Sequence, residues 1–190
     1  LLSDEVYERL VFDGREHQSV LRYPNLFGRS LATFSFGKTF HNTGWKMGYC
    51  MAPEPLMREF RKVHQYNVFS VNTPMQYALA DYLQDPEVYL SLPDFYQQKR
   101  DQFKELLSGT GFRPIPSEGT YFQLADYSGL SDLPDVAFAE WMTREKGVAS
   151  IPVSVFYESG RDERVVRFCF AKTPEVLEQA GERLRRVGVQ

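Results

Sequence analysis

The sequence contains few residues that bind metal ions or form disulfide bonds. Among its 190 residues are only two cysteines and three histidines. His17, His41 and His64 are scattered and lack the spacing of a metal site. Cys50 and Cys169 each lie in an apolar stretch, where a reduced, buried cysteine is the usual state. We therefore expect no metal centre, no disulfide, and a reducing, cytoplasmic location.

The sequence also lacks long apolar runs and a strong excess of charge of one sign. No apolar run approaches the length needed to cross a bilayer. Acidic and basic residues are interspersed, and the net charge is −3. We therefore expect neither a membrane partner nor a nucleic-acid partner. The apolar fraction of 43% is high enough for packed cores, and 190 residues can form one ordinary domain or two small ones.

The most informative part of the sequence is residues 35–48, which read SFGKTFHNTGWKMG. Residues 31–36, which lead into it, are apolar and rich in aromatic residues, and they predict a buried strand. Lys38 follows this strand, and a partly dehydrated lysine amine can attack carbonyl groups. Lys46 lies between Gly44 and Gly48, and two cations with small residues between them can hold a phosphate group. Taken alone, however, a Gly-Lys pair is far more often part of a solvated surface.

The whole stretch resembles the cofactor-lysine motif of the class I and II aminotransferases, the fold-type I pyridoxal-phosphate enzymes. It departs from the general pattern at His41 and Asn42, and at Lys46, where arginine is commoner. The form Lys-Thr-Phe-x-x-Thr-Gly-Trp-Lys-x-Gly is similar to the methionine and kynurenine aminotransferase branch. The resemblance implies that Lys38 forms a Schiff base with pyridoxal 5'-phosphate and moves a proton during catalysis. It also implies that Ser35 and Lys46 help to hold the cofactor phosphate.

A second match lies at the start of the chain, in residues 1–7 (LLSDEVY), which we interpret as the end of a strand and the turn after it. An aspartate in such a place is, taken alone, more often a turn or helix cap. The resemblance implies instead that Asp4 pairs with the pyridine nitrogen of the cofactor and that Tyr7 hydrogen-bonds its phenolic oxygen. The interval between Asp4 and Lys38 leaves room for one crossover between parallel strands. Both residues are therefore expected at the same carboxyl edge of a sheet.

Arg167 lies within the apolar run of residues 165–170 (VVRFCF), where an arginine is costly unless it is paired or reaches solvent. The pattern alone leaves two interpretations open. Arg167 can face water from an edge strand, or its guanidinium can grip a carboxylate through two parallel hydrogen bonds. The resemblance favours the second, because it implies that Arg167 holds the α-carboxylate of the substrate.

The predicted fold class is α/β. By resemblance, residues 1–93 are the C-terminal part of the large α/β/α cofactor-binding domain. A connecting helix and a small α+β domain then occupy residues 94–190. Residues 73–76 (TPMQ) look like a capping box that starts a helix, and residues 148–153 predict a strand.

The resemblance covers the C-terminal half of the family's length, and the first residue is not methionine. We therefore expect the chain to be part of a longer protein. The missing half would carry further cofactor contacts, so residues 1–190 alone are expected to bind the cofactor weakly or not at all. The intact protein is expected to be a homodimer.

The function implied is that of an aminotransferase that moves the amino group of an L-amino acid to a 2-oxo acid. The donor class is methionine, aromatic amino acids, glutamine or kynurenine. A cysteine-conjugate β-lyase with the same Lys38, Asp4 and Arg167 remains open, as do a non-catalytic sensor domain and an inactive fragment. The joint presence of Asp4, Tyr7, Lys38, Lys46 and Arg167 favours the enzyme.

Overall fold

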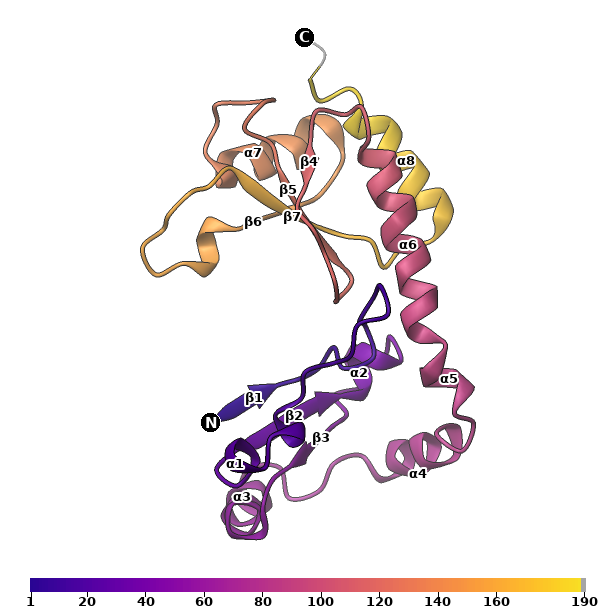
Figure 1. The fold of residues 1–190 in the computed structure, drawn as a ribbon, viewed down its shortest axis with the longest axis vertical. Helices are drawn as coiled ribbons and strands as arrows, with labels where there is room; N and C mark the ends of the chain where they lie inside the picture. Colours follow the sequence, from indigo (N-terminus) through magenta and orange to yellow (C-terminus); the bar gives the residue numbers. More distant parts are fainter. Residues whose placement is uncertain (189–190) are drawn as a thin grey trace. The chain divides into compact units, whose positions relative to one another are not determined.

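The computed structural model describes residues 1–188. The chain divides into two compact units, one formed by Leu1–Asp94 and one that starts at Phe95 (Figure 1). The first contains a three-stranded sheet of order β1-β2-β3, and the second a four-stranded sheet of order β4-β5-β7-β6. Within residues 1–188, no helix has both the length and the apolar composition needed to cross a membrane.

The sheet of the first unit combines one parallel and one antiparallel pair. β1 (Leu2–Asp4) runs parallel to β2 (Leu31–Ser35), and β2 runs antiparallel to β3 (Gly48–Met51). Side chains alternate along β2, so that Ala32 and Phe34 are buried on one face. The crossover from β1 to β2 carries two short helices, η1 (Val20–Arg22) and α1 (Pro24–Phe27).

Helices follow the sheet strands in the rest of the first unit. The short helices α2 (Phe36–Thr39) and η2 (Thr43–Trp45) lie between β2 and β3 in the sequence, and α3 (Glu54–Asn67), α4 (Thr73–Tyr82) and α5 (Glu87–Leu90) come after β3. α3 buries none of its residues within the described structure. Two of its apolar residues, Phe60 and Val63, are 37% and 68% exposed.

The start of α4 differs from the predicted capping box. The N-cap is Asn72, whose side-chain oxygen accepts a hydrogen bond from the Met75 backbone N–H at 3.2 Å. Thr73 already belongs to the helix, so the predicted cap was wrong by one residue. Asparagine and threonine are both good N-cap residues, and the sequence pattern alone does not separate the two positions.

The second unit pairs helices with an antiparallel sheet. Its elements are α6 (Leu92–Leu107, which starts within the first unit), β4 (Arg113–Pro114), β5 (Phe122–Asp126), α7 (Asp135–Trp141), a π-helical turn (Met142–Lys146), β6 (Ile151–Pro152), η4 (Ser154–Phe156), β7 (Val165–Cys169) and α8 (Pro174–Leu184). The strand predicted for residues 148–153 is therefore reduced to two residues. Pro152 has no N–H to donate, which limits its pairing with β7.

The core of the second unit lies between the sheet and its helices. Phe168 of β7 packs its ring 5.6 Å from that of Phe103 in α6 and 5.6 Å from that of Phe112. Tyr127 stacks on Phe138 of α7 with ring centroids 3.9 Å apart. Because side chains alternate along a strand, Arg167 points to the opposite face of the sheet from Phe168.

The buried ring of Phe138 provides a test of this core. Phe138 is fully buried against Tyr127, so we expect Phe138→Ala to reduce the free energy of unfolding by about 3–5 kcal/mol in urea denaturation. Val136→Ala is the matched control, because Val136 lies in the same helix and is 44% exposed. We expect the control to change stability by about 0.5 kcal/mol or less. Equal losses in the two variants would contradict the assignment of Phe138 to the core.

Candidate active site

The carboxyl ends of β1 and β2 form one edge of the sheet in the first unit. Asp4 is the last residue of β1 and Ser35 is the last residue of β2. Because the two strands are parallel and Asp4 lies opposite Thr33, both ends point the same way. Asp4 is exposed, and its carboxylate forms no hydrogen bond or ion pair with any residue in 1–188. The carboxylate is therefore available to a ligand at this edge.

The turn that carries Lys38 is held by a close approach of two backbone segments. A Cβ atom added to Gly37 would lie 2.9 Å from the Cα atom of Thr43, so a larger residue does not fit without displacement of the backbone. The Gly37 carbonyl accepts hydrogen bonds from the Thr43 hydroxyl at 3.0 Å and from the Asn42 N–H at 3.1 Å. These contacts fix the backbone next to Lys38.

The structure brings Lys38 close to Tyr7. The Lys38 Nζ lies 6.0 Å from the centroid of the Tyr7 ring, and both residues are half-buried. Tyr7 comes from the turn after β1, and Lys38 from α2 directly after β2. An amine and a phenol, drawn from two segments, therefore meet near the edge that carries the Asp4 carboxylate.

Lys46 lies at the end of η2, in a backbone conformation that is unusual for its residue type. Its φ of 57° is left-handed, a region that non-glycine residues seldom adopt. Such strain often accompanies function. The side chain is exposed and forms no hydrogen bond or ion pair within the described residues, so its amine is free to meet an anion.

Arg167 lies on an interior strand of the second unit. β7 is paired with β5 on one side and β6 on the other, and Arg167 lies opposite Leu124 and Ile151. The interpretation of Arg167 as an edge-strand residue was therefore wrong. Its Nε atom is buried and has no hydrogen-bond partner. A buried donor without a partner is costly, which favours a ligand that accepts hydrogen bonds here.

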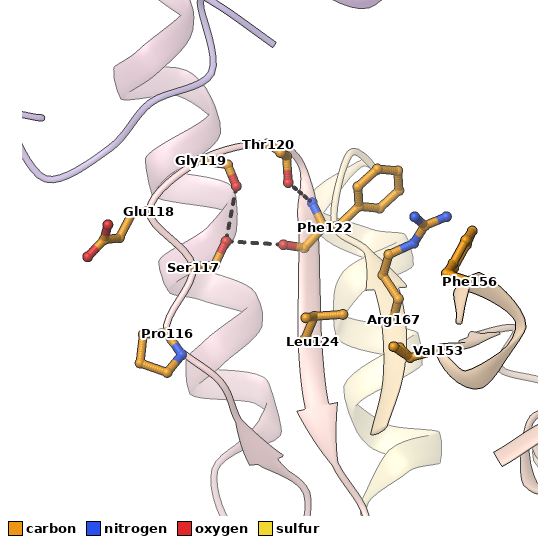
Figure 2. Close-up of a pocket in the computed structure, with 10 residues that line it drawn as sticks. All are labelled: Pro116, Ser117, Glu118, Gly119, Thr120, Phe122, Leu124, Val153, Phe156 and Arg167. Atoms are coloured by element: carbon orange, nitrogen blue, oxygen red, sulfur yellow. Dashed lines mark hydrogen bonds between the residues drawn. The ribbon is translucent and has the colours of Figure 1, made fainter. Parts of the chain in front are cut away.

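The Arg167 side chain opens into a cavity of about 440 Å³. Figure 2 shows the guanidinium between the rings of Phe122 and Phe156. The residues that line the cavity are mostly apolar or small, and they are Pro116, Ser117, Glu118, Gly119, Thr120, Phe122, Leu124, Val153, Phe156 and Arg167. A guanidinium in such surroundings suits an anionic group attached to an apolar body.

Comparison with known proteins gives the family. The family described as "Aminotransferase class I and II" matches residues 1–184. The chain is 54% identical over 188 residues to a methionine aminotransferase of Escherichia coli, covering 98% of this chain and 49% of that protein.

The chain belongs to the class I and II aminotransferase family.

Other relatives agree with this assignment. The aminotransferase chain is 41% identical to kynurenine–oxoglutarate transaminase 3 of Rattus norvegicus, over 97% of this chain and 45% of that protein. The solved structure of the Escherichia coli methionine aminotransferase superposes with a TM-score of 0.94 at 54% identity, covering 97% of this chain and 49% of that one. An N-succinyldiaminopimelate aminotransferase from Mycobacterium tuberculosis superposes with a TM-score of 0.90 at 32% identity, covering 98% of this chain and 49% of that one.

The comparisons confirm the predicted family and its fold-type I class. The aminotransferase chain spans about half the length of the curated relatives it matches. Enzymes of this family depend on pyridoxal phosphate and act on amino acids and 2-oxo acids. The roles of the individual residues Asp4, Tyr7, Ser35, Lys38, Lys46 and Arg167 stay predictions.

The sequence analysis missed a buried anchor next to Asp4. Glu5 is only 5% exposed. Its Oε1 accepts hydrogen bonds from the Ser3 hydroxyl and the Val20 N–H, both at 2.9 Å, and its Oε2 lies 2.8 Å from His17 Nε2. Ser3 belongs to β1, whereas His17 and Val20 belong to the crossover, so Glu5 ties the end of β1 to that loop. No local pattern in the sequence signals such a contact.

The hydrogen bonds to Glu5 change its acidity. Burial alone would raise the pKa of this carboxyl, but hydrogen bonds from Ser19, Val20, His17 and Ser3 outweigh burial and hold the pKa below its ordinary value of 4.5. The carboxylate form is therefore stabilised by folding. This contribution is present above pH 4.5 and is lost as the pH falls through the lower pKa of the folded state.

The pH dependence of stability tests the Glu5 anchor. We expect Glu5→Gln to reduce the free energy of unfolding at pH 7 by about 1–3 kcal/mol, since charge-assisted bonds are lost in a buried place. The difference from wild type should begin to shrink below pH 4.5, where the unfolded wild-type chain takes up a proton, and should be smallest below the lower pKa of the folded state.

Glu59→Gln is the control for this experiment, because Glu59 is exposed and pairs only with surface residues. We expect it to change stability by about 0.5 kcal/mol or less at either pH. If Glu5→Gln lowers the free energy of unfolding by the same amount at pH 7 and at acid pH, the charge of Glu5 does not contribute to stability.

Proposed function

We propose that the full-length protein is a pyridoxal-phosphate-dependent aminotransferase that uses Lys38 as its catalytic lysine. The observation that carries the proposal is the meeting of Lys38 and Tyr7 near the sheet edge that ends in Asp4, in a chain of this family. An amine, a phenol and a free carboxylate are the groups that an aldehyde-bearing, protonated pyridine requires. Ser35 and Lys46 add a hydroxyl and a second amine for a phosphate.

The residues present fit the cofactor by their chemistry. Asp4 has no partner among residues 1–188, so it can accept a hydrogen bond from a pyridinium nitrogen. When bound, the cofactor supplies an aldehyde that condenses with amines and a ring that takes up negative charge from the substrate's α-carbon. We assign Tyr7 to the phenolic oxygen, and Ser35 and Lys46 to the phosphate.

Lys38 has two tasks in this proposal. Its amine would hold the cofactor through the cofactor's aldehyde group. The same Nζ would take the proton from the substrate's α-carbon as a general base. The fixed backbone of the Gly37–Thr43 approach limits where this amine can reach, which favours transfer at one carbon.

Arg167 recognises the substrate carboxylate in this proposal. Its buried Nε without a partner and its apolar cavity support the assignment. The cavity also supports an apolar substrate side chain, as in methionine, aromatic amino acids and kynurenine, with glutamine as a polar member of the class. The names of two relatives, methionine aminotransferase and kynurenine–oxoglutarate transaminase, support this donor class, with 2-oxo acids as acceptors.

We also propose how the chain fits into the whole protein. Residues 1–93 form the C-terminal part of the large cofactor-binding domain, and residues 94–190 form the connecting helix and the small domain. The protein acts as a cytoplasmic homodimer. The exposed apolar side chains of Phe60, Val63 and Tyr66 support burial of this surface by another part of the protein or by a second subunit. The free state of both cysteines supports a reducing compartment.

Replacement of the catalytic lysine tests the proposed function. With L-methionine and a 2-oxo acid, the full-length protein should form the 2-oxo acid of methionine, measured by chromatography of the products. Lys38→Ala should lower kcat by at least about a hundredfold, because the base for the α-proton is lost. Lys62→Ala is the control, since Lys62 is an exposed lysine that pairs with Glu59, and it should leave kcat unchanged.

Two results would contradict the proposal. One is a Lys38→Ala variant that retains the activity of the wild type. The other is release of pyruvate from a cysteine conjugate without an added 2-oxo acid, and without any transamination, which would indicate a β-lyase.

A further inference from the structure

The Arg167 guanidinium is held by aromatic rings rather than by acidic side chains. Its Cζ atom lies 4.0 Å from the ring centroid of Phe122 and 5.1 Å from that of Phe156. Arg167 forms no ion pair with another part of the described chain, and its buried Nε has no hydrogen-bond partner. Figure 2 shows the guanidinium between the two rings. Its orientation therefore depends on the rings that face it.

The two rings are supported in different ways. Phe122 belongs to β5 and lies opposite Cys169 in the ladder to β7, so the sheet itself fixes it. Phe156 ends the short turn η4, and its side chain is 60% exposed. Because most of Phe156 is exposed, burial in a core does not restrain its ring. The position of this ring must therefore follow from whatever holds the turn.

Asp135 holds that turn from the start of α7. The side chain is only 1% exposed. Its Oδ2 accepts a hydrogen bond from the Ser154 N–H, and its Oδ1 accepts one from the Ser154 hydroxyl, both at 2.7 Å. Short hydrogen bonds to a carboxylate are about twice as strong as neutral ones. The N–H groups of Phe156 and Tyr157 donate within residues 153–157, and the Tyr157 carbonyl accepts from the Gly160 N–H, so these bonds shape the turn. The Val153 N–H, at the start of the turn, donates to the Val165 carbonyl of β7 at 3.3 Å, which is longer than either hydrogen bond to Asp135.

We propose that Asp135 is a positioning residue for substrate recognition: through Ser154 it holds the Phe156 ring against the Arg167 guanidinium, opposite Phe122. This inference rests on the proposed function, in which Arg167 binds the substrate carboxylate. Because the two rings attract the guanidinium without accepting its N–H hydrogen bonds, the donor edge of the guanidinium stays open to a ligand. That edge carries the N–H donors that match a planar carboxylate in two parallel hydrogen bonds.

The proposal predicts a loss of affinity only for ligands that carry a carboxylate. If the turn is released, Phe156 no longer restrains the guanidinium. The Arg167 side chain then loses more conformational freedom when it binds a carboxylate, which lowers the affinity. A ligand without a carboxylate does not use Arg167, so its affinity should not change. A general disturbance of the fold would weaken both kinds of ligand.

The experiment compares two ligands with variants of the full-length protein loaded with pyridoxal phosphate. The dissociation constants of L-methionine and of its decarboxylated analogue, methylthiopropylamine, are measured from the absorbance change of the cofactor on binding. The test variants are Asp135→Asn and Phe156→Leu. Asparagine keeps the shape of aspartate but replaces one acceptor of a Ser154 hydrogen bond with a donor.

The matched control is Val155→Ala, because Val155 lies in the same turn and is 58% exposed. We expect both test variants to raise the dissociation constant of L-methionine about threefold to thirtyfold, the range of a partly desolvated cation–π contact. Methylthiopropylamine should bind each variant as it binds wild type, and kcat should change less than KM. Val155→Ala should match wild type with both ligands.

Arg167→Gln separates failure of this inference from failure of the proposed function. If Arg167→Gln leaves methionine binding unchanged, the assignment of the carboxylate to Arg167 is wrong. If Arg167→Gln lowers the affinity for methionine but Asp135→Asn and Phe156→Leu do not, only the positioning role of Asp135 is overturned. Equal weakening of both ligands in the test variants would likewise overturn it.

A variant that does not fold is replaced within the same design. Asp135 is buried, so Asp135→Asn must first show a wild-type circular dichroism spectrum. If it does not, Ser154→Ala removes one of the two hydrogen bonds, and Phe156→Leu removes the ring while Asp135 stays intact. Unchanged methionine affinity in both of these variants would overturn the proposal.

Discussion

The parallel pairing of β1 with β2 is the interaction on which the candidate site depends. It places Asp4 opposite Thr33, so that the end of β1 and the turn after β2 share one edge of the sheet. A shift of the register by one residue would turn every side chain of the strand to the other face. Glu5 supports this register by tying the end of β1 to the loop at Val20. The site is therefore built on backbone pairing first and on side chains second.

In the second unit, the main constraint is that the Arg167 guanidinium lies on an interior strand and must stay free to bind a ligand. Arg167 has neighbours on both sides in the sheet and no acidic partner among the described residues. An ion pair would satisfy the guanidinium, but it would also compete with an incoming carboxylate. The rings of Phe122 and Phe156 attract the cation without occupying its hydrogen-bond donors. The arrangement leaves Arg167 oriented and still free to bind.

Local patterns in the sequence predicted the structural features that depend on residues close together in the chain. The strand predicted at residues 31–36 is close to β2, because a short run of apolar and aromatic residues is typical of a buried strand. The cap of α4 was missed by one residue, since Asn72 and Thr73 are both good caps. The contacts Glu5–His17 and Asp135–Ser154 join residues far apart in the sequence, and no pattern reports them. The candidate residues were named from a family motif, whereas the anchors beside them required the structure.

The most direct test of the central claim is reduction of the full-length protein with borohydride in the presence of pyridoxal phosphate, followed by mass mapping of its peptides. Borohydride converts an imine to a stable amine and so marks the lysine that binds the cofactor. We expect a phosphopyridoxyl group on the peptide that contains Lys38, and on no other lysine in stoichiometric amount. An adduct found only on other lysines such as Lys46, or no adduct at all, would contradict the account.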